Sequence, residues 1–288
     1  MKIDELFLHD FADESFKENK KDKIAIKNIQ ENGAKVIYVD VKDSNNKFQK
    51  QIGTYITIEC ENDHDNSKII AKYLKEILKK NKLKKSSHVL IVGLGNDSYL
   101  SDALGPKVIK EINVTSHLPK NNYEIEVSCF IPGVMAVTGL ESSMMIKSLI
   151  DKFNIDLLIV VDSLATKSIS RLYRTYQITD TGLNPGSGIN NNRLAINSKE
   201  MGIPTIAIGV ATVVDTASLV INTLNLLDQS VTKKIKARDL YAILYYNDYN
   251  FVMTSKEIDS LIDVISYNIA DAINLTLNPK LAINDTIR

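Results

Sequence analysis

Hydrophobic and polar residues alternate along two stretches near the start of the chain, with a turn signal between them. Residues 23–27 alternate, Asn32-Gly33 is typical of a tight turn, and residues 36–41 have the composition of a second strand. This pattern predicts a β-hairpin. Residues 55–60 predict a third strand, and residues 64–85 predict a helix with a lysine-rich, solvated end.

From residue 88 onward, short apolar runs alternate with stretches of helical periodicity. We expect strands at residues 88–93, 125–130, 157–161, 173–178 and 203–208, and helices at residues 102–112, 138–153 and 215–227. Thr138 and Glu141 fit a capping box at the start of the second helix. Strands separated by helices predict an α/β fold with a mainly parallel, twisted sheet and helices on both faces.

A final helix is predicted from Thr254, which fits a second capping box with Glu257. Its apolar stripe consists of Ile258, Leu261, Ile262, Ile265, Ile269 and Ile273. We expect this stripe to pack on the same domain rather than on another subunit. The chain shows no repeat and no linker, which indicates one α/β domain over residues 22–288 with a β-rich N-terminal addition. Residues 1–21 are mostly polar, and we expect a loosely attached segment there.

Composition excludes several classes of protein. The 288 residues include 35 basic and 35 acidic side chains, so no net charge points to nucleic acid or a membrane as a partner. The longest apolar stretch is about half of the roughly 20 residues that a membrane helix needs. Two cysteines, Cys60 and Cys129, make no disulfide framework, and the N-terminus resembles no export signal. A reducing, cytoplasmic compartment is indicated.

The first candidate motif is the glycine-rich stretch 92–106. Gly93 and Gly95 directly follow a predicted strand, as in dinucleotide-binding folds, but Ser98 occupies the position of the third glycine. Nucleotide binding is therefore a minor alternative. Ser101 could cap the helix that Asp102 begins, and Asp102 would then be a first-turn acid favoured by the helix dipole.

A second candidate is Asp162, which follows five apolar strand residues. Asp102 and Asp162 both follow buried strands, so both belong to the carboxyl edge of the sheet, where ligands bind in folds of this class. Two carboxyl groups held close together repel each other when both are ionised, so one of them keeps its proton. The protonated group can act as an acid and the ionised group as a base. Amide hydrolysis by an activated water needs such a pair. The same pair could instead hold a divalent metal ion.

The histidines, the loop 179–193 and Cys129 are weaker candidates for a catalytic or metal-binding role. The four histidines (His9, His64, His88 and His117) lack the H-E-x-x-H pattern and the close spacing of zinc ligands, which argues against a zinc protease of the zincin type. The glycine- and asparagine-rich loop 179–193 is neither a P-loop nor a nucleophile elbow, but Asp180 in it could join the site. Cys129 is expected to be a buried, inert thiol.

Several of these motifs, in this order and spacing, resemble those of germination proteases. The matching stretches are 96–106, 131–141, 161–165, 178–188 and 202–215, with weaker similarity at 253–279. The resemblance implies an atypical aspartic-type endopeptidase of the spore core that degrades small acid-soluble spore proteins, with a fold similar to hydrogenase maturation proteases. It assigns catalysis to Asp102 and Asp162 with no metal and no cofactor, and implies a homotetramer without direct nucleic-acid or membrane binding. Asn96, Asp180 and Ser187 are candidate residues of the substrate cleft.

The resemblance also implies a zymogen that removes a short N-terminal propeptide by self-processing. The processing site should carry an acid, a large apolar residue, an alanine and a further acid. His9 to Glu14 fits this pattern, which predicts cleavage between Asp10 and Phe11 and a propeptide of about residues 1–10.

The chain departs from the family pattern beside both aspartates. Tyr99-Leu100-Ser101 replaces the more common Thr-Pro, and Ser163 stands where alanine is usual. Two alternatives therefore remain beside the spore endopeptidase. One is a metal-dependent maturation-type peptidase of the same fold, and the other is a non-catalytic nucleotide- or protein-binding module.

Overall fold

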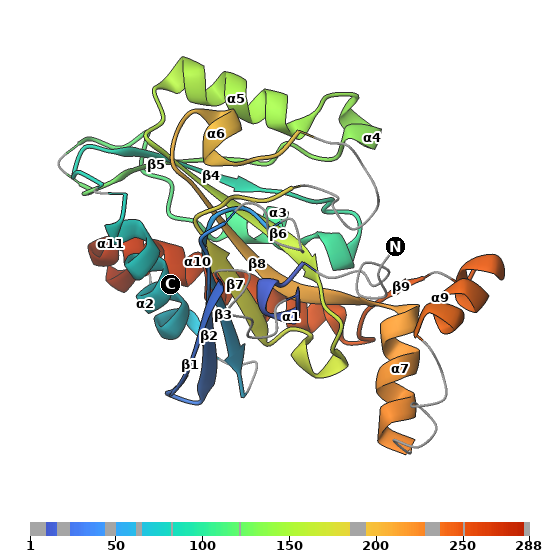
Figure 1. Ribbon diagram of the computed structural model, residues 1–288. Helices are drawn as coiled ribbons and strands as arrows, with labels where there is room; N and C mark the ends of the chain where they lie inside the picture. Colours follow the sequence, from blue (N-terminus) through green and yellow to red (C-terminus); the bar gives the residue numbers. More distant parts are fainter. Residues whose placement is uncertain are drawn as a thin grey trace.

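A mixed β-sheet runs through the molecule and carries helices on both faces (Figure 1). The computed structural model describes residues 10–15, 24–43, 50–61, 65–81, 83–120, 122–184, 194–227, 237–249 and 251–284. Within these residues the strand order is β1-β2-β3-β7-β8-β6-β4-β5, with β9 paired to β8. The strands are β1 (Ile24–Glu31), β2 (Ala34–Val41), β3 (Gly53–Cys60), β4 (His88–Gly93), β5 (Glu126–Phe130), β6 (Leu157–Ala165), β7 (Thr175–Thr179), β8 (Thr205–Asp215) and β9 (Val252–Met253).

The helices divide between the two faces of the sheet. The helices are α1 (Ala12–Ser15), α2 (Ser67–Lys79), α3 (Leu104–Lys110), α4 (Met135–Thr138), α5 (Ser142–Phe153), α6 (Ser198–Met201), α7 (Thr216–Leu227), α9 (Ala237–Tyr246), α10 (Ile258–Leu277) and α11 (Pro279–Asn284), with 3-10 turns η3 (Leu100–Asp102) and η4 (Ile169–Arg171). Helices α2, α3 and α10 share one hydrophobic core with the sheet. Side chains of α5, α6 and α1 pack on the opposite face.

The predicted hairpin is confirmed. Strands β1 and β2 pair from Ile24↔Val41 to Glu31↔Ala34, so the turn between them consists of two residues. Asn32 and Gly33 there have φ of 47° and 73°. Asparagine and glycine tolerate this left-handed conformation, and two such residues give a turn whose twist matches that of the strands. The third predicted strand, β3, continues the antiparallel part of the sheet.

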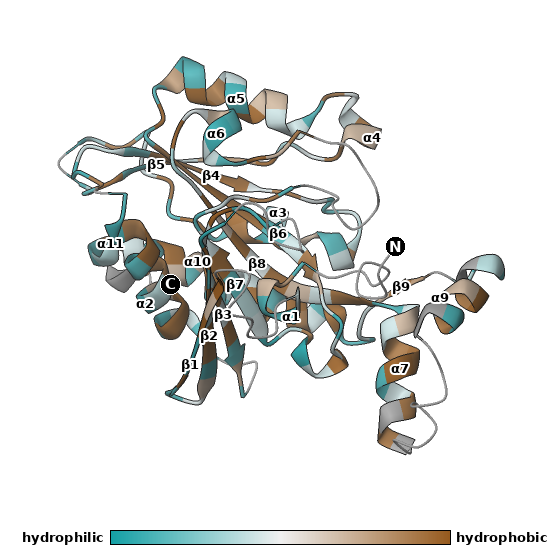
Figure 2. Ribbon diagram, viewed as in Figure 1, coloured by the Kyte–Doolittle hydropathy of each residue, from teal (hydrophilic) through white to brown (hydrophobic). Residues whose placement is uncertain are grey.

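The α/β class is confirmed, but the sheet is mixed rather than mainly parallel. Strands β5, β4, β6 and β8 are parallel and consist largely of apolar residues (Figure 2). Residues 89–93 of β4, 157–161 of β6 and 205–212 of β8 are buried. Strand β7 runs antiparallel to β8 and joins this part to β3. The residues between β6 and β7 form only the short turn η4, and a return of that length allows reversal but no parallel crossover.

Both predicted capping boxes are wrong. Gly139, with φ of 70°, ends the short helix α4, so the next helix begins only at Ser142. A left-handed glycine is a common end of a helix. Thr254 donates its hydroxyl hydrogen bond to the carbonyl oxygen of Thr212, 2.8 Å away, and α10 begins at Ile258 with no side-chain cap at Glu257.

The stripe of α10 packs on its own domain, as expected. Ile262, Ile265 and Ile269 are fully buried, and the helix lies against α2 and α3. The described part of the N-terminal segment, Asp10–Ser15, is not loosely attached, because Phe11 and Ala12 are also fully buried.

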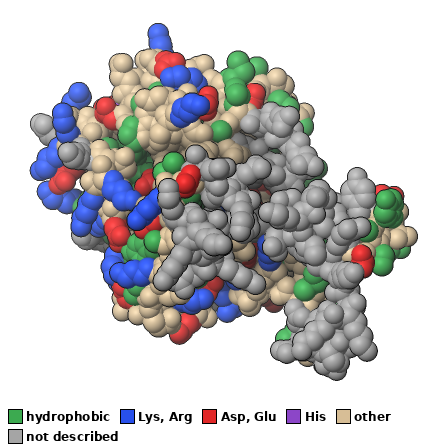
Figure 3. Space-filling view, viewed as in Figure 1, with side chains coloured by type: hydrophobic (Ala, Val, Ile, Leu, Met, Phe, Trp, Pro, Cys, Tyr) green, Lys and Arg blue, Asp and Glu red, His purple; other side chains and the backbone are tan. Residues whose placement is uncertain are grey.

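Acidic and basic side chains are interspersed over the visible described surface, in keeping with the balanced composition (Figure 3). No helix in the described ranges is long and apolar enough to cross a membrane.

Candidate active site at the carboxyl edge of the sheet

The parallel strands β4 and β6 end side by side at the edge where the candidate aspartates lie. Gly93 of β4 pairs with Val161 of β6, and the N–H of Leu94 donates to the carbonyl oxygen of Val161 over 2.9 Å. The next residue of β6 is Asp162, which pairs across the strands with Gly209 of β8. Strand β6 therefore continues through Asp162 instead of ending before it, and the register of both neighbours fixes the position of this carboxylate.

Asp162 is half-buried and accepts the N–H of Ser163 at its Oδ1 atom over 2.9 Å. Leu158 and Val160 belong to the core under α5 and α6. Since side chains alternate along a strand, Asp162 lies on the same face as these two residues. The buried Ser163 hydroxyl has no hydrogen-bond partner within the described part of the chain.

Asp102 occupies a different local structure from the one expected. It ends the 3-10 turn η3 instead of beginning a helix, and its N–H donates to the carbonyl oxygen of Tyr99 over 2.8 Å. Helix α3 begins two residues later, and its N-cap residue is Ala103, so Ser101 does not cap it. Pro106 lies in the first turn of α3, where a residue without an N–H costs no helical hydrogen bond.

The turn that carries Asp102 packs on the strand that carries Asp162. Turn η3 contacts β6 and β8, and the Thr212 hydroxyl of β8 donates to the carbonyl oxygen of Ser101 over 3.1 Å. A Cβ atom on Gly95 would lie 1.9 Å from the carbonyl oxygen of Asp102, so only glycine allows the turn to approach this closely. The structure thus brings both aspartate segments to one edge, while the catalytic roles of Asp102 and Asp162 stay predictions.

The three candidate cleft residues have different positions. Asn96 lies beside Asp102, because its N–H donates to the carbonyl oxygen of Asp102 over 2.9 Å. Asp180 accepts the N–H of Thr54 and forms an ion pair of 3.1 Å with Lys80, so it joins β3, β7 and α2. Ser187 lies outside the described residues.

The glycines of the loop after β4 serve packing by the chain itself. A Cβ atom on Gly93 would meet the carbonyl oxygen of Gly105 at 2.2 Å, and Gly95 is covered by Asp102. The N–H groups of Leu94 and Asn96 already donate to backbone carbonyls. A phosphate site needs such N–H groups to be available to the ligand, so the geometry disfavours the nucleotide alternative.

Among the described residues, the cysteines and histidines form no reactive centre of their own. Burial raises the pKa of the Cys129 thiol to about 12, so it remains protonated at neutral pH, as expected for an inert thiol. His88 hydrogen-bonds Ser128 and Phe153 at the base of the sheet. Within the described ranges, no three His, Cys, Asp or Glu side chains gather closely enough to hold a metal ion.

The described N-terminal segment Asp10–Ser15, here called the leader, begins near the end of β6, and it contains both residues of the predicted processing site, Asp10 and Phe11. The N–H of Asp10 donates to the carbonyl oxygen of Ala165 over 3.0 Å, three positions beyond Asp162. Arg171 forms ion pairs with Asp13 and Glu14 of the same leader. No local sequence pattern reveals Arg171, because these two partners lie more than 150 positions away from it.

Comparisons with known proteins agree on one family. The family model for germination protease matches residues 2–243. A germination protease of Caldanaerobacter subterraneus subsp. tengcongensis is 38% identical, and the match covers 94% of this chain and 93% of that protein. Germination proteases of Clostridium perfringens and Clostridium tetani are 35% and 36% identical, and those matches cover 88% and 91% of this chain and 88% and 90% of the relatives.

Replacing Gly95 tests how closely the Asp102 turn depends on backbone contact. We expect Gly95→Ala to lower the free energy of unfolding by at least about 3 kcal/mol, because the new methyl group would overlap the carbonyl of Asp102. Gly139→Ala is the matched control, because Gly139 also has a positive φ but nothing lies within 4 Å of its would-be Cβ. Its cost should be about 1–2 kcal/mol. Equal losses in urea denaturation would contradict the assigned contact.

Proposed function

The chain belongs to the germination protease family, and we propose that it is an endopeptidase that hydrolyses small acid-soluble spore proteins in the core of the germinating spore. The observation that carries this proposal is the family match over residues 2–243, which includes both candidate aspartates and the leader. The position of Asp102 and Asp162 at one edge of a sheet supports it, because ligands of open α/β sheets bind at this edge.

The proposed mechanism uses the two aspartates around one water molecule. The ionised carboxylate removes a proton from the water, and the resulting hydroxide adds to the carbonyl carbon of the scissile peptide. The protonated carboxyl group then gives its proton to the leaving nitrogen as the C–N bond breaks. The products are a carboxylic acid, which passes its proton to the released amine, and that amine. Return of one proton from the base to the acid restores the starting state of the two carboxyl groups.

We assign the base to Asp162 and the acid to Asp102. The Asp162 carboxylate accepts an N–H from Ser163, and such a donor stabilises negative charge on the oxygen. Asp102 sits on a turn held by backbone hydrogen bonds to Tyr99 and Asn96, which fixes its main chain near the end of β6. A fixed main chain favours the defined geometry that proton transfer to a leaving group requires.

We further propose that the protein is made as a zymogen and cleaves itself between Asp10 and Phe11. The leader has the predicted order of acid, large apolar residue, alanine and further acids. Its placement beside the end of β6 supports the proposal, since the bond to be cut follows the residue that hydrogen-bonds Ala165.

Conservative replacement of either aspartate should remove the activity. We expect Asp102→Asn and Asp162→Asn each to lower the rate of hydrolysis of spore proteins by about 10³-fold or more, because an amide can neither accept nor give the required proton. Asp97→Asn is the control, because Asp97 lies in the same loop but forms an exposed ion pair with Lys110. The rates are measured by gel and mass spectrometry. Full activity in both aspartate variants would contradict the mechanism.

Self-processing is tested by sequencing the N-terminus. On incubation, the unmodified chain should yield a product that begins at Phe11, whereas the Asp162→Asn chain should keep its original N-terminus. Mixing the inactive chain with a small amount of active enzyme then distinguishes cleavage within a molecule from cleavage between molecules. A product that begins elsewhere, or equal processing of the Asp162→Asn chain, would refute the assigned site or the assigned residue.

We propose that the chain forms a homo-oligomer, a homotetramer by family resemblance, through α7 and α9. These helices project from the body of the molecule (Figure 1), and the segment they form with β9 exposes large apolar side chains: Leu226, Ile243, Tyr246, Tyr249, Phe251 and Val252. Exposed apolar clusters of this kind mark association surfaces.

Sedimentation velocity tests the oligomer directly. The unmodified chain should sediment as a species larger than the 32.2 kDa monomer, and Leu226→Glu with Tyr246→Glu should shift it towards the monomer because two new charges would be desolvated in the interface. A monomeric wild-type chain would refute the oligomer, and an unchanged oligomer in the double variant would refute the assigned surface.

A further inference from the structure

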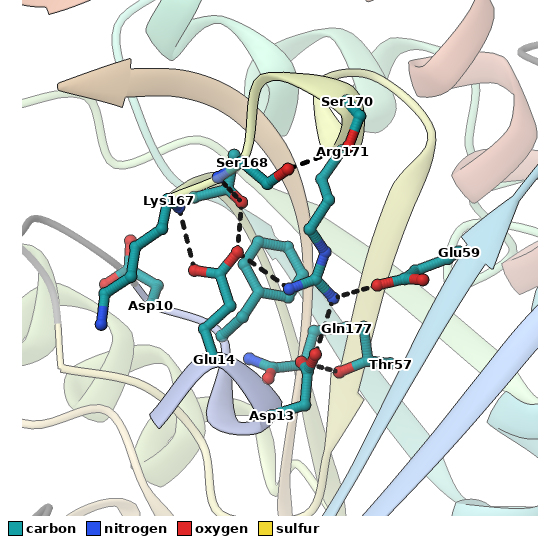
Figure 4. Close-up of polar contacts among 12 residues, drawn as sticks. Asp10, Asp13, Glu14, Thr57, Glu59, Lys167, Ser168, Ser170, Arg171 and Gln177 are labelled. Carbon is teal, nitrogen blue, oxygen red and sulfur yellow. Dashed lines mark hydrogen bonds and ion pairs between the residues drawn. The ribbon is translucent and has the colours of Figure 1, made fainter. Parts of the chain in front are cut away.

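The leader, Asp10–Ser15, is bound to the protein in the manner of a peptide ligand (Figure 4). Phe11 and Ala12 have no exposed surface, and Ala12 belongs to a small apolar cluster on the antiparallel part of the sheet. The contacts of the leader come from β3, β6, β7 and η4, which are far from it in the sequence. These contacts define a site that recognises a chain segment rather than a turn that follows from local sequence.

This site lies on the same face of the sheet as Asp162. Asp162 pairs with Gly209, Gly209 pairs with Gln177, and Gln177 pairs with Thr57, so these four residues form one row across β6, β8, β7 and β3. Cross-strand partners place their side chains on one face. Two strand spacings, about 10 Å, separate the backbones of Asp162 and Gln177.

The leader binds the far end of this row. The Ala12 N–H donates to Oε1 of Gln177 over 2.8 Å, and the Thr57 hydroxyl donates to Oδ1 of Asp13 over 2.8 Å. Gly209, between Gln177 and Asp162, has no side chain, and Leu164 fills the space above it. A peptide bound at Gln177 and Thr57 therefore lies along the face that carries Asp162.

Asp10 joins the leader to the strand of Asp162. Its N–H donates to the carbonyl oxygen of Ala165, and its Oδ2 accepts the N–H of Ala165 over 2.8 Å. The Lys50 ammonium donates to the carbonyl oxygen of Asp10 over 2.9 Å. Burial lowers the pKa of Lys50, although the carboxylates of Asp10, Glu14 and Asp13 counteract the shift. The main chain of Asp10 is thus held at its N–H group by Ala165 and at its carbonyl oxygen by Lys50.

Arg171 recognises the acids that follow. Its guanidinium pairs with Glu14 at 2.8 Å and with Asp13 at 2.9 Å, and Phe11 lies with its ring centroid 4.8 Å from the guanidinium carbon. Only 9% of the Arg171 side chain is exposed. Burial opposes its charge, but the carboxylates of Asp13, Glu14 and Glu59 outweigh that effect and raise the pKa of the guanidinium.

The chemistry of this site exceeds what attachment of a terminus requires. Removing three carboxylates and one guanidinium from water costs free energy that an apolar contact of similar size would not cost. In return, the site matches each residue of the leader: an aromatic ring lies at the guanidinium, a small residue lies over the sheet, and two acids pair with Arg171. Such matched contacts are the means by which a site can discriminate between peptides.

We propose that Lys50, Thr57, Arg171, Gln177 and the backbone of Ala165 form a peptide-recognition site, here called the leader site, in which Arg171 determines specificity. The site binds a substrate segment with the order acid, large apolar residue, small residue, acid, acid, and the leader occupies it as an intramolecular competitor. This inference deepens the proposed function and rests on it, because it assigns recognition of the substrate to named residues of this chain.

Cleavage between Asp10 and Phe11 would weaken the competitor. The contacts with Ala165 and Lys50 belong to Asp10, whereas those with Gln177, Thr57 and Arg171 belong to the residues after the cut. After cleavage, the remaining segment keeps only the second group of contacts. An external peptide with both groups of contacts then competes more effectively for the leader site.

A binding measurement tests the leader site without relying on hydrolysis. A fluorescein-labelled peptide with the sequence of residues 8–16 is titrated with full-length chains that carry Asp162→Asn, which prevents cleavage. Adding Asp13→Asn and Glu14→Gln weakens the leader in place while the site stays intact. We expect the peptide to bind this chain at least about 10-fold more tightly than the parent, because a buried charged contact of the competitor is lost.

Variants of the site provide the second arm. In the chain with the weakened leader, Arg171→Lys should abolish the gain, and Thr57→Val, which is isosteric, should weaken binding by a smaller factor. Arg174→Lys is the control, because the Arg174 guanidinium donates a long hydrogen bond to the carbonyl oxygen of Glu61 and, among the described residues, forms no ion pair with the leader. A second peptide with Asn and Gln in place of its acids should not bind. Circular dichroism confirms folding of each chain.

The outcomes separate the two proposals. A folded chain with a weakened leader that binds no more tightly than the parent, or that binds the acid-free peptide equally well, overturns the leader site. If the variants at Arg171 and Thr57 weaken peptide binding as expected but the unmodified chain hydrolyses no spore protein, the leader site is supported and the proposed activity is overturned. Unchanged hydrolysis of spore proteins in the Arg171→Lys chain would leave the activity and overturn the recognition role.

Discussion

Strand β6 pairs in parallel with β4 on one side and with β8 on the other, and this pairing sets the positions of both hydrophobic cores, of Asp162 and of the leader. Residues 157–161 of this strand are fully buried, so the strand contributes apolar side chains to both cores. A shift of one residue would exchange the faces of every side chain and place Asp162 in the core of α2, α3 and α10. The same register fixes Asp162 beside Leu94 and Gly209, and Ala165 beside Asp10.

Features with a local cause are predictable from the sequence. The β1–β2 hairpin follows from a two-residue Asn-Gly turn, and α10 follows from its apolar stripe, because both patterns act within one element. The strand that leads to Asp162 follows from its apolar run in the same way. The sequence therefore predicts that both aspartate segments meet at the carboxyl edge of the sheet, and the structure places them there.

Features that depend on distant contacts are not predictable in the same way. Thr254 matches a capping box, yet its hydroxyl donates to the carbonyl oxygen of Thr212 in β8. A local sequence pattern contains no information about that distant partner. The Asp102 turn is 3-10 because it packs against Gly95 and β8, not because of its own residues. Arg171 has no neighbouring sequence signal, since the three carboxylates around it come from α1 and β3.

The site and the leader together suggest how one surface serves two tasks. Asp102 and Asp162 would supply proton transfer at the carboxyl edge, while the row from Gly209 to Thr57 would align a peptide on the same face. An enzyme that recognises its own leader and its substrates with the same groups needs only one set of specificity residues. The activity of such an enzyme would depend on how tightly the leader binds these specificity residues. The ion pairs of Arg171 with Asp13 and Glu14 would largely determine that affinity.

A crystal structure of the Asp162→Asn chain with Asp13→Asn and Glu14→Gln, bound to an uncleaved substrate peptide, would show whether recognition and catalysis share one face. The acids of the peptide should contact Arg171, and its scissile carbonyl should lie between Asp102 and residue 162, with a water molecule in hydrogen-bonding reach. A peptide bound elsewhere on the molecule, or one whose scissile bond lies far from both residues, would refute the shared surface.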